Sequence, residues 1–166
     1  YTTTTHDDGT ITATITGYIG KIAGDLVVPA ELDGIRVTEI GKYAFTDCRG
    51  FTGGLILPEG ITRIDKQAFS GCSGFTGTLN IPKTVTYIGD GAFVHCDGFT
   101  GDLYFPDGLT TIDSGAFNCC TGIENIFIPA SLKILGSYAL STCTSLQRVY
   151  FFGDVPVDWG LYVFIS

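Results

Sequence analysis

Hydrophobic and polar positions repeat along the chain with a period of 24 residues. The unit is clearest from Thr78 to Gly101, where short apolar segments alternate with glycine, threonine and proline, residues typical of turns. One proline of the unit recurs as Pro58, Pro82 and Pro106, and after a step of 23 residues as Pro129. A period of this length predicts a solenoid, in which each unit buries its apolar face only against its neighbours.

Each unit contains a short apolar segment that ends at this proline. The four segments that follow the first unit are residues 55–58, 79–82, 103–106 and 126–129. We interpret them as strands, in which Leu55 and Leu57 would share one face while Ile56 takes the other. Proline ends each strand because it donates no hydrogen bond to a neighbouring strand.

The rest of the unit supplies further core positions. In the central unit these are Val85 and Ile88, then Ala92-Phe93, and finally Cys96 and Phe99. We expect the segment around the Ala-Phe pair to form a short helical turn.

The repeat also predicts columns of equivalent residues. Phe93 should be buried in the middle of the stack and should touch Phe69 and Phe117. One cysteine per coil forms a second column, at Cys48, Cys72, Cys96, Cys120 and Cys143. Stacked side chains are about 5 Å apart and parallel, whereas metal ligands must converge and disulfide partners must point towards each other. We therefore expect buried free thiols that act as small core residues.

Both ends of the chain depart from the repeat. Gly9 to Tyr18 alternates isoleucine and alanine with threonine, so we expect a strand within an N-terminal β cap over residues 1–23. About five repeats of 23–24 residues occupy residues 24–152, and the first carries a five-residue insertion within Ala30 to Arg36. We interpret residues 153–166 as a degenerate last half-repeat or C-terminal cap.

Composition limits the possible partners. The chain has 166 residues, of which 45% are hydrophobic, and this suits one domain with a substantial core. The formal net charge is −8 and only 9 residues are Lys or Arg, which argues against nucleic-acid binding and a polybasic membrane anchor. Because no stretch of about 18 apolar residues is present, we expect no membrane insertion. The sequence begins at Tyr1 without a signal peptide, so we expect a processed or trimmed chain.

A more specific pattern is Ile-Pro-x-x-Val-Thr-x-Ile-Gly-x-x-Ala-Phe-x-x-Cys, which runs from Ile81 to Cys96. Leu-x-x-Val-x-Phe, from Leu146 to Phe151, fits the core of leucine-rich repeats. These residues resemble the BspA-like leucine-rich repeats of bacterial and protist surface proteins. The resemblance covers roughly residues 24–164, and several of its fixed offsets recur from coil to coil.

The resemblance implies both a fold and a class of function. The fold is an α/β-type repeat solenoid: a right-handed leucine-rich repeat coil with a parallel strand ladder, short helical or 3-10 turns and an N-terminal strand cap. The function is that of a secreted or cell-surface bacterial module for protein interaction or adhesion to host or matrix proteins, without enzymatic activity. A glycan bound through exposed aromatic side chains is the alternative ligand. We expect a monomer that needs no cofactor.

Few residues suggest catalysis. Cys119 occupies the position that His95 holds one coil earlier, which would place a thiol beside an imidazole. No orienting acid occupies this position in the adjacent coils, and a flat flank offers no pocket, so we interpret both as residues of a solvent-facing corner. Asp65 and Asp113 should lie about 10 Å apart, slightly too far for a pair of glycosidase carboxylates. We predict no catalytic, cofactor-binding or metal-binding residue.

Strand alternation predicts the candidate binding surface. On each strand the residue between two inward-facing ones must point outward. In successive coils this residue is Val27, Ile56, Asn80, Tyr104, Phe127 and Tyr150. Such an apolar column marks a partner site, with Tyr104, Phe127 and Tyr150 as anchors, or it only reflects the preference of these residue types for strands.

Overall fold

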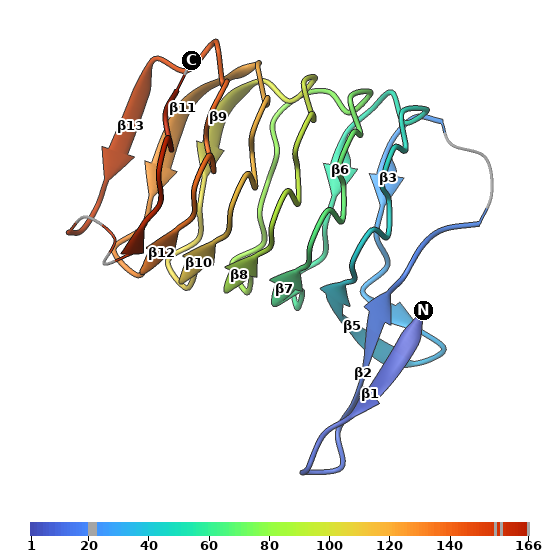
Figure 1. Ribbon diagram of the computed structural model, residues 1–166. Coiled ribbons are helices and arrows are strands. Elements are labelled where there is room, and N and C mark those ends of the chain that lie inside the picture. Colours follow the sequence, from blue (N-terminus) through green and yellow to red (C-terminus); the bar gives the residue numbers. More distant parts are fainter. Residues whose placement is uncertain (20–22, 155, 157, 166) are drawn as a thin grey trace.

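The computed structural model describes residues 1–19, 23–154, 156 and 158–165. Successive coils lie side by side along one axis, so the predicted parallel-strand solenoid is confirmed (Figure 1). Parts of the predicted cap (residues 1–23) and of the predicted last half-repeat (residues 153–166) lie outside the described residues.

The longest sheet follows one side of the solenoid, and each coil adds one short parallel strand to it. In spatial order its strands are β1 (Thr2–Thr5), β2 (Ile11–Ile15), β5 (Ile35–Ile40), β7 (Arg63–Ile64), β8 (Tyr87–Ile88), β10 (Thr111–Ile112), β12 (Ile134–Leu135) and β14 (Asp158–Trp159). β1 pairs with β2 in the antiparallel sense, and β4 (Glu31–Leu32) pairs with β5 in the same way. The remaining pairs are parallel because the chain returns to this side in the same direction after each turn.

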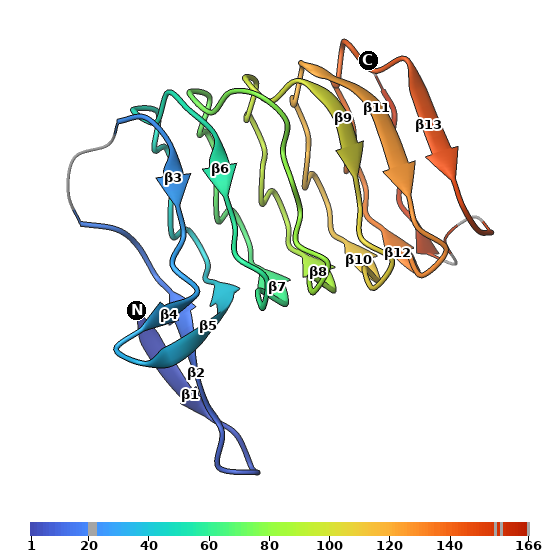
Figure 2. The same cartoon turned by 180° about the vertical axis from the view of Figure 1, so that it is seen from behind.

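A second face of the solenoid carries two smaller sheets (Figure 2). One consists of β3 (Leu26–Val27) and β6 (Leu55–Ile56), and the other of β9 (Gly101–Tyr104), β11 (Ile123–Ile128) and β13 (Arg148–Phe151). Residues 79–81 lie between them in sequence and form no strand, so the strand predicted at 79–82 is wrong. Asn80 explains this difference, because asparagine is depleted in strands whereas its apolar and aromatic counterparts favour them.

Phenylalanine side chains stack along the core. Phe93 is fully buried, and its ring centroid lies 5.2 Å from that of Phe69 and 5.1 Å from that of Phe117, which confirms the predicted contacts. Phe75 and Phe99 belong to a second stack, with ring centroids 5.5 Å apart. These columns bury apolar rings between neighbouring coils, as expected for a repeat protein.

The segment around each Ala-Phe pair is a row of hydrogen-bonded turns, and the predicted helical turns are absent from the described residues. Ala68 N and Ser70 N donate to carbonyls three residues earlier, whereas Gln67 N and Phe69 N donate to carbonyls of the next coil. Gln67 has a φ of 51°. Because every second donor bonds to the next coil, the i to i−4 ladder of an α-helix cannot form.

The five cysteines of the column are free and buried, as predicted. The Cys72 thiol donates to Phe45 O at 2.9 Å, and the Cys96 thiol donates to Phe69 O at 3.1 Å. Burial raises the pKa of Cys72 to about 12 and that of Cys143 to about 11. These thiols therefore stay protonated at neutral pH and join neighbouring coils as weak donors.

The N-terminal segment covers one end of the core. β2 pairs in parallel with β5 and buries Ala13 completely. The Tyr18 ring then closes both phenylalanine columns, with its centroid 6.0 Å from that of Phe45 and 6.0 Å from that of Phe51. Such a cover protects the edge that a solenoid would otherwise expose.

β4 and β5 form a hairpin that contains the insertion of the first coil. Its turn residues, Asp33 and Gly34, have φ values of 51° and 76°. Val37 N donates to Ala30 O at 2.8 Å, which closes the base of the hairpin. β5 then pairs with β7 through its last residues, where the ladder of the longest sheet continues.

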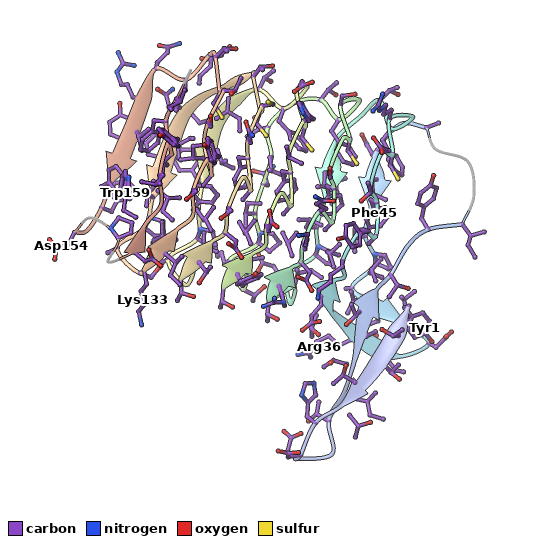
Figure 3. The ribbon with its side chains drawn as sticks, viewed as in Figure 1. Tyr1, Arg36, Phe45, Lys133, Asp154 and Trp159 are labelled. Atoms are coloured by element: carbon purple, nitrogen blue, oxygen red, sulfur yellow. The ribbon has the colours of Figure 1, made fainter. Side chains whose placement is uncertain are left out.

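The C-terminal segment lies against the last coil. β14 pairs with β12, and Val163 is buried there. The Trp159 ring centroid lies 5.7 Å from that of Phe151 and 5.7 Å from that of Phe164. Figure 3 shows Trp159 towards the C-terminal end of the solenoid and Phe45 towards the other.

Candidate binding surface

The predicted outward-facing residues lie on the face that carries the two smaller sheets (Figure 2). The exposed fraction is 61% for Val27, 49% for Ile56, 56% for Tyr104 and 42% for Tyr150. Asn80 is exposed as well, whereas Phe127 is half-buried because it lies between two aromatic neighbours.

Strand register brings the aromatic members together. Phe127 of β11 pairs with Tyr104 of β9 and with Tyr150 of β13. The Tyr104 and Phe127 ring centroids are 4.1 Å apart with 8° between the planes, and those of Phe127 and Tyr150 are 4.7 Å apart with 9° between the planes. Phe152 extends the group at 6.3 Å from Phe127. We call these four residues the aromatic column.

The predicted column is not continuous. Val27 and Ile56 pair with each other through β3 and β6. Asn80 lies in the coil without a strand on this face, so it separates that aliphatic pair from the aromatic column. The strand ladder beneath the predicted column is therefore interrupted at Asn80.

A polar row lies beside the aromatic column, and the sequence analysis did not predict it. It consists of Asp102, Asn125 and Arg148, which pair in register on the same three strands. Asn125 Nδ2 donates to Asp102 Oδ1 at 2.7 Å, and the Tyr104 hydroxyl donates to Asp102 Oδ2 at 3.2 Å. Asn125 Oδ1 is buried without a hydrogen-bond partner among the described residues, so the row keeps one unused acceptor.

The signal for this row is present in the sequence. Each of its members precedes a member of the aromatic column by two residues, and residues two apart on a strand share a face. Each of these strands therefore has two outward residues, and the predicted column contains only the second of them.

Stacking decides which groups the aromatic column presents. Phe127 lies between two rings that cover both of its faces, so mainly its edge, which carries partial positive charge, points to solvent. Tyr104 and Tyr150 each have one face covered by Phe127. Desolvation and the hydrogen bond to Asp102 raise the pKa of Tyr104, so its hydroxyl remains a neutral donor. The surface therefore combines apolar ring edges with hydroxyl, carboxylate, amide and guanidinium groups.

Cys119 and His95 occupy equivalent positions in their turns. Their φ values are 61° and 57°, and Gly71 has a φ of 72° at the same position of an earlier coil. His95 is exposed, and the Cys119 thiol lies 3.3 Å from Asn118 Oδ1. This position is thus defined by a left-handed backbone conformation, and its side chains vary.

Asp65 and Asp113 stabilise the turns that follow their strands. Asp65 Oδ1 accepts a hydrogen bond from Lys66 N at 2.8 Å, and Asp113 Oδ1 accepts one from Ser114 N at 2.7 Å. Asp113 Oδ2 also accepts from the Tyr87 hydroxyl at 3.0 Å. Bonds from an aspartate to the following backbone are typical of turns.

The described part of the chain offers neither a metal cluster nor a membrane-spanning helix. No three His, Cys, Asp or Glu side chains converge there as metal ligands would. In the same residues, no helix has the length and hydrophobicity needed to cross a membrane.

The family model for the BspA type leucine rich repeat region (6 copies) matches residues 38–164 of this chain. No protein with a curated description matches the sequence. The match to the family model begins within the first coil, at residue 38. It therefore covers every strand of the two smaller sheets except β3.

Solved structures with the same fold come from several bacteria. A leucine-rich repeat protein of T. pallidum is 23% identical over 97% of this chain and 82% of its own, with a TM-score of 0.67. A leucine rich cell surface protein of Faecalibacterium prausnitzii is 22% identical over 92% of this chain and 53% of its own, with a TM-score of 0.54. A Bacteroides ovatus leucine-rich repeat protein is 21% identical over 93% and 51%, with a TM-score of 0.50. This chain spans about half the length of the latter two.

Proposed function

We propose that this chain, which belongs to the family of BspA-type leucine-rich repeat proteins, is a non-enzymatic recognition module that binds a protein ligand outside the cell. Leucine-rich repeat solenoids typically serve protein interaction rather than catalysis, because a long repetitive face offers a large contact area and few enclosed pockets. The expected ligand is an extracellular protein, for example one of the host matrix. The expected location is the cell surface or the secreted fraction.

The aromatic column is the observation that carries this proposal. It places four aromatic side chains on one sheet face, with Tyr104 56% exposed and Phe152 67% exposed. Tyrosine and other aromatic residues dominate protein interface energetics, and rigid rings lose little entropy on binding. The stacked rings are already ordered before a ligand arrives.

The polar row supports a protein ligand in particular. Asp102 and Arg148 carry opposite charges at its two ends, and Asn125 lies between them. A partner with complementary charges would be oriented by this row while its apolar residues contact the ring edges. A glycan remains the second candidate ligand, because Tyr104 is stacked on one side only.

A cell-surface location fits three observations. The Faecalibacterium prausnitzii protein of the same fold is described as a cell surface protein. A surface adhesin also needs an extended rigid face, and the solenoid provides one. The buried thiols are compatible with an oxidising environment, since their side chains stack in parallel and are protected from solvent.

The test is a binding assay on immobilised host matrix proteins with two double variants. Tyr104→Ser with Phe127→Ser removes the centre of the aromatic column and should abolish binding. Val27→Ser with Ile56→Ser changes the aliphatic pair in the same outward position and should retain binding.

Both variants should remain folded. Exposed cross-strand pairs contribute about 0.2–1 kcal/mol each, so the melting temperature of the aromatic double variant should fall by only a few degrees. Unimpaired binding by this variant would remove the aromatic column from the site. Absence of binding by the unmodified chain to every matrix protein would reject that ligand class.

A further inference from the structure

On the face that carries the two smaller sheets, the strand ladder is interrupted at Leu79, Asn80 and Ile81. None of these three residues takes part in a backbone hydrogen bond among the described residues, although β6 and β9 on either side are paired. Polar backbone groups without a protein partner must bond to water or to a ligand. The interruption therefore leaves unused donors and acceptors in the middle of the face.

A groove lies at the interruption. Its walls are Ile81 and Lys83 from one coil and Tyr104, Phe105, Pro106 and Asp107 from the next. Its volume is about 450 Å³, which falls within the range of small-molecule sites.

The Tyr104 ring forms the wall on the side of the aromatic column. Phe127 covers one ring face at 4.1 Å, so the surface that borders the groove is the opposite face. At the equivalent position one coil earlier, Asn80 is too short to cover it. The ring is held in place by the stack and by the hydrogen bond from its hydroxyl to Asp102.

We propose that this groove binds one neutral pyranose ring of a glycan, stacked on the free face of Tyr104. The axial C–H bonds of a pyranose carry partial positive charge and suit the negative face of the ring. Its hydroxyl groups donate and accept, so they match the Lys83 ammonium, the Asp107 carboxylate and the unpaired backbone groups of Ile81.

Charge favours a neutral sugar over an acidic one. Asp102 and Asp107 lie on either side of Tyr104 in sequence, and Lys83 is the one cation lining the groove. The whole chain has a formal net charge of −8, which repels anionic ligands further. An aromatic or proline side chain of a protein could also stack on Tyr104, but it would leave the polar groups of the groove without partners.

The experiment is an NMR titration of the intact chain with neutral methyl hexopyranosides and N-acetylhexosamines, and with methyl glucuronide for comparison. At least one neutral sugar should bind with a Kd on the order of 1 mM, as expected for a single ring, and should shift the signals of residues 80–83 and 104–108. Methyl glucuronide should bind more weakly.

Asn80→Tyr is the decisive variant, because a tyrosine there would stack on Tyr104 and fill the groove. It should raise the Kd at least about tenfold, as loss of an aromatic contact surface would. Ile56→Tyr is the matched control, since it adds a tyrosine at the same outward position one coil further from Tyr104 and should leave sugar binding unchanged. Asn80 and Ile56 are both exposed, so a tyrosine at either position needs no repacking of the core and both variants should fold.

Two results would overturn the sugar site: no neutral sugar causes shifts around the groove, or Asn80→Tyr binds as tightly as the unmodified chain. Tight binding of a matrix protein that Asn80→Tyr abolishes would assign the groove to a protein side chain instead. The site does not depend on the protein-binding function proposed above. Asn80→Tyr should leave the aromatic column intact, whereas the Tyr104 and Phe127 double variant removes it.

Discussion

Phe93→Ala tests whether the solenoid is held together between its coils. Phe93 is fully buried and lies between Phe69 and Phe117, with ring centroids 5.2 Å and 5.1 Å away, and its edge-on contact with Phe99 is 6.4 Å between centroids. The substitution removes one ring from the centre of a continuous stack. Three aromatic contacts are lost together.

The expected loss is at the upper end of the range for phenylalanine in a core. Replacement of a buried phenylalanine by alanine costs about 3–5 kcal/mol, and the cost depends on how far the site can collapse. Collapse is restricted here, because Phe69 N donates to Ala92 O and Phe93 N donates to Ala116 O, which fix the spacing of the coils. We therefore expect a decrease of about 4–5 kcal/mol in the free energy of unfolding.

Urea unfolding followed by circular dichroism measures this decrease. With a slope near 2 kcal/mol per M, the midpoint should fall by about 2 M. Phe45→Ala should cost less, about 3 kcal/mol, because Phe45 lies at the end of the stack and Tyr18 is 6.0 Å away on its outer side. Phe152→Ala, at a side chain that is 67% exposed, should change stability by less than about 0.5 kcal/mol. A loss below about 1 kcal/mol for Phe93→Ala would refute the stacking argument.

Two further predictions concern the cysteines and the insertion. In denaturant without reductant, all 6 cysteines should react with a thiol reagent, and two or fewer reactive thiols would contradict free cysteines. In the folded chain the half-buried Cys119 should react first, because the other five cysteines are buried. Deletion of five residues within Ala30 to Arg36 should leave a folded chain with an unchanged far-ultraviolet circular dichroism spectrum. The reason is that the hairpin ends before the residues that pair β5 with β7. Global unfolding of this variant would show that the hairpin is part of the core.

The sequence predicts the repeat and its core because each core position recurs at a fixed offset. The columns of Phe93 and Cys96 are examples: one ring and one thiol per coil must stack if the coils stack. The corner before each strand also follows from the repeat. A Cβ on Gly98 would lie 2.0 Å from Phe75 O, so this position requires glycine for close approach of two coils.

The turns could not be predicted from a single unit. The Ala-Phe segment has residues compatible with a helix, and local preference alone favours one. What prevents it is the neighbouring coil, whose carbonyls accept from Gln67 N and Phe69 N. These contacts join residues more than twenty positions apart, and a pattern confined to one unit contains no trace of them.

The candidate binding surface shows the same limit. Alternation predicts that Tyr104, Phe127 and Tyr150 point outward, but only the register of β9, β11 and β13 shows that their rings stack. In a solenoid the regular residues build the scaffold, so a ligand can distinguish one coil from another only where a coil departs from the repeat. Asn80 is such a departure. It separates the aliphatic pair from the aromatic column and leaves the strand ladder open, and the groove between Ile81 and Tyr104 lies next to it in the chain.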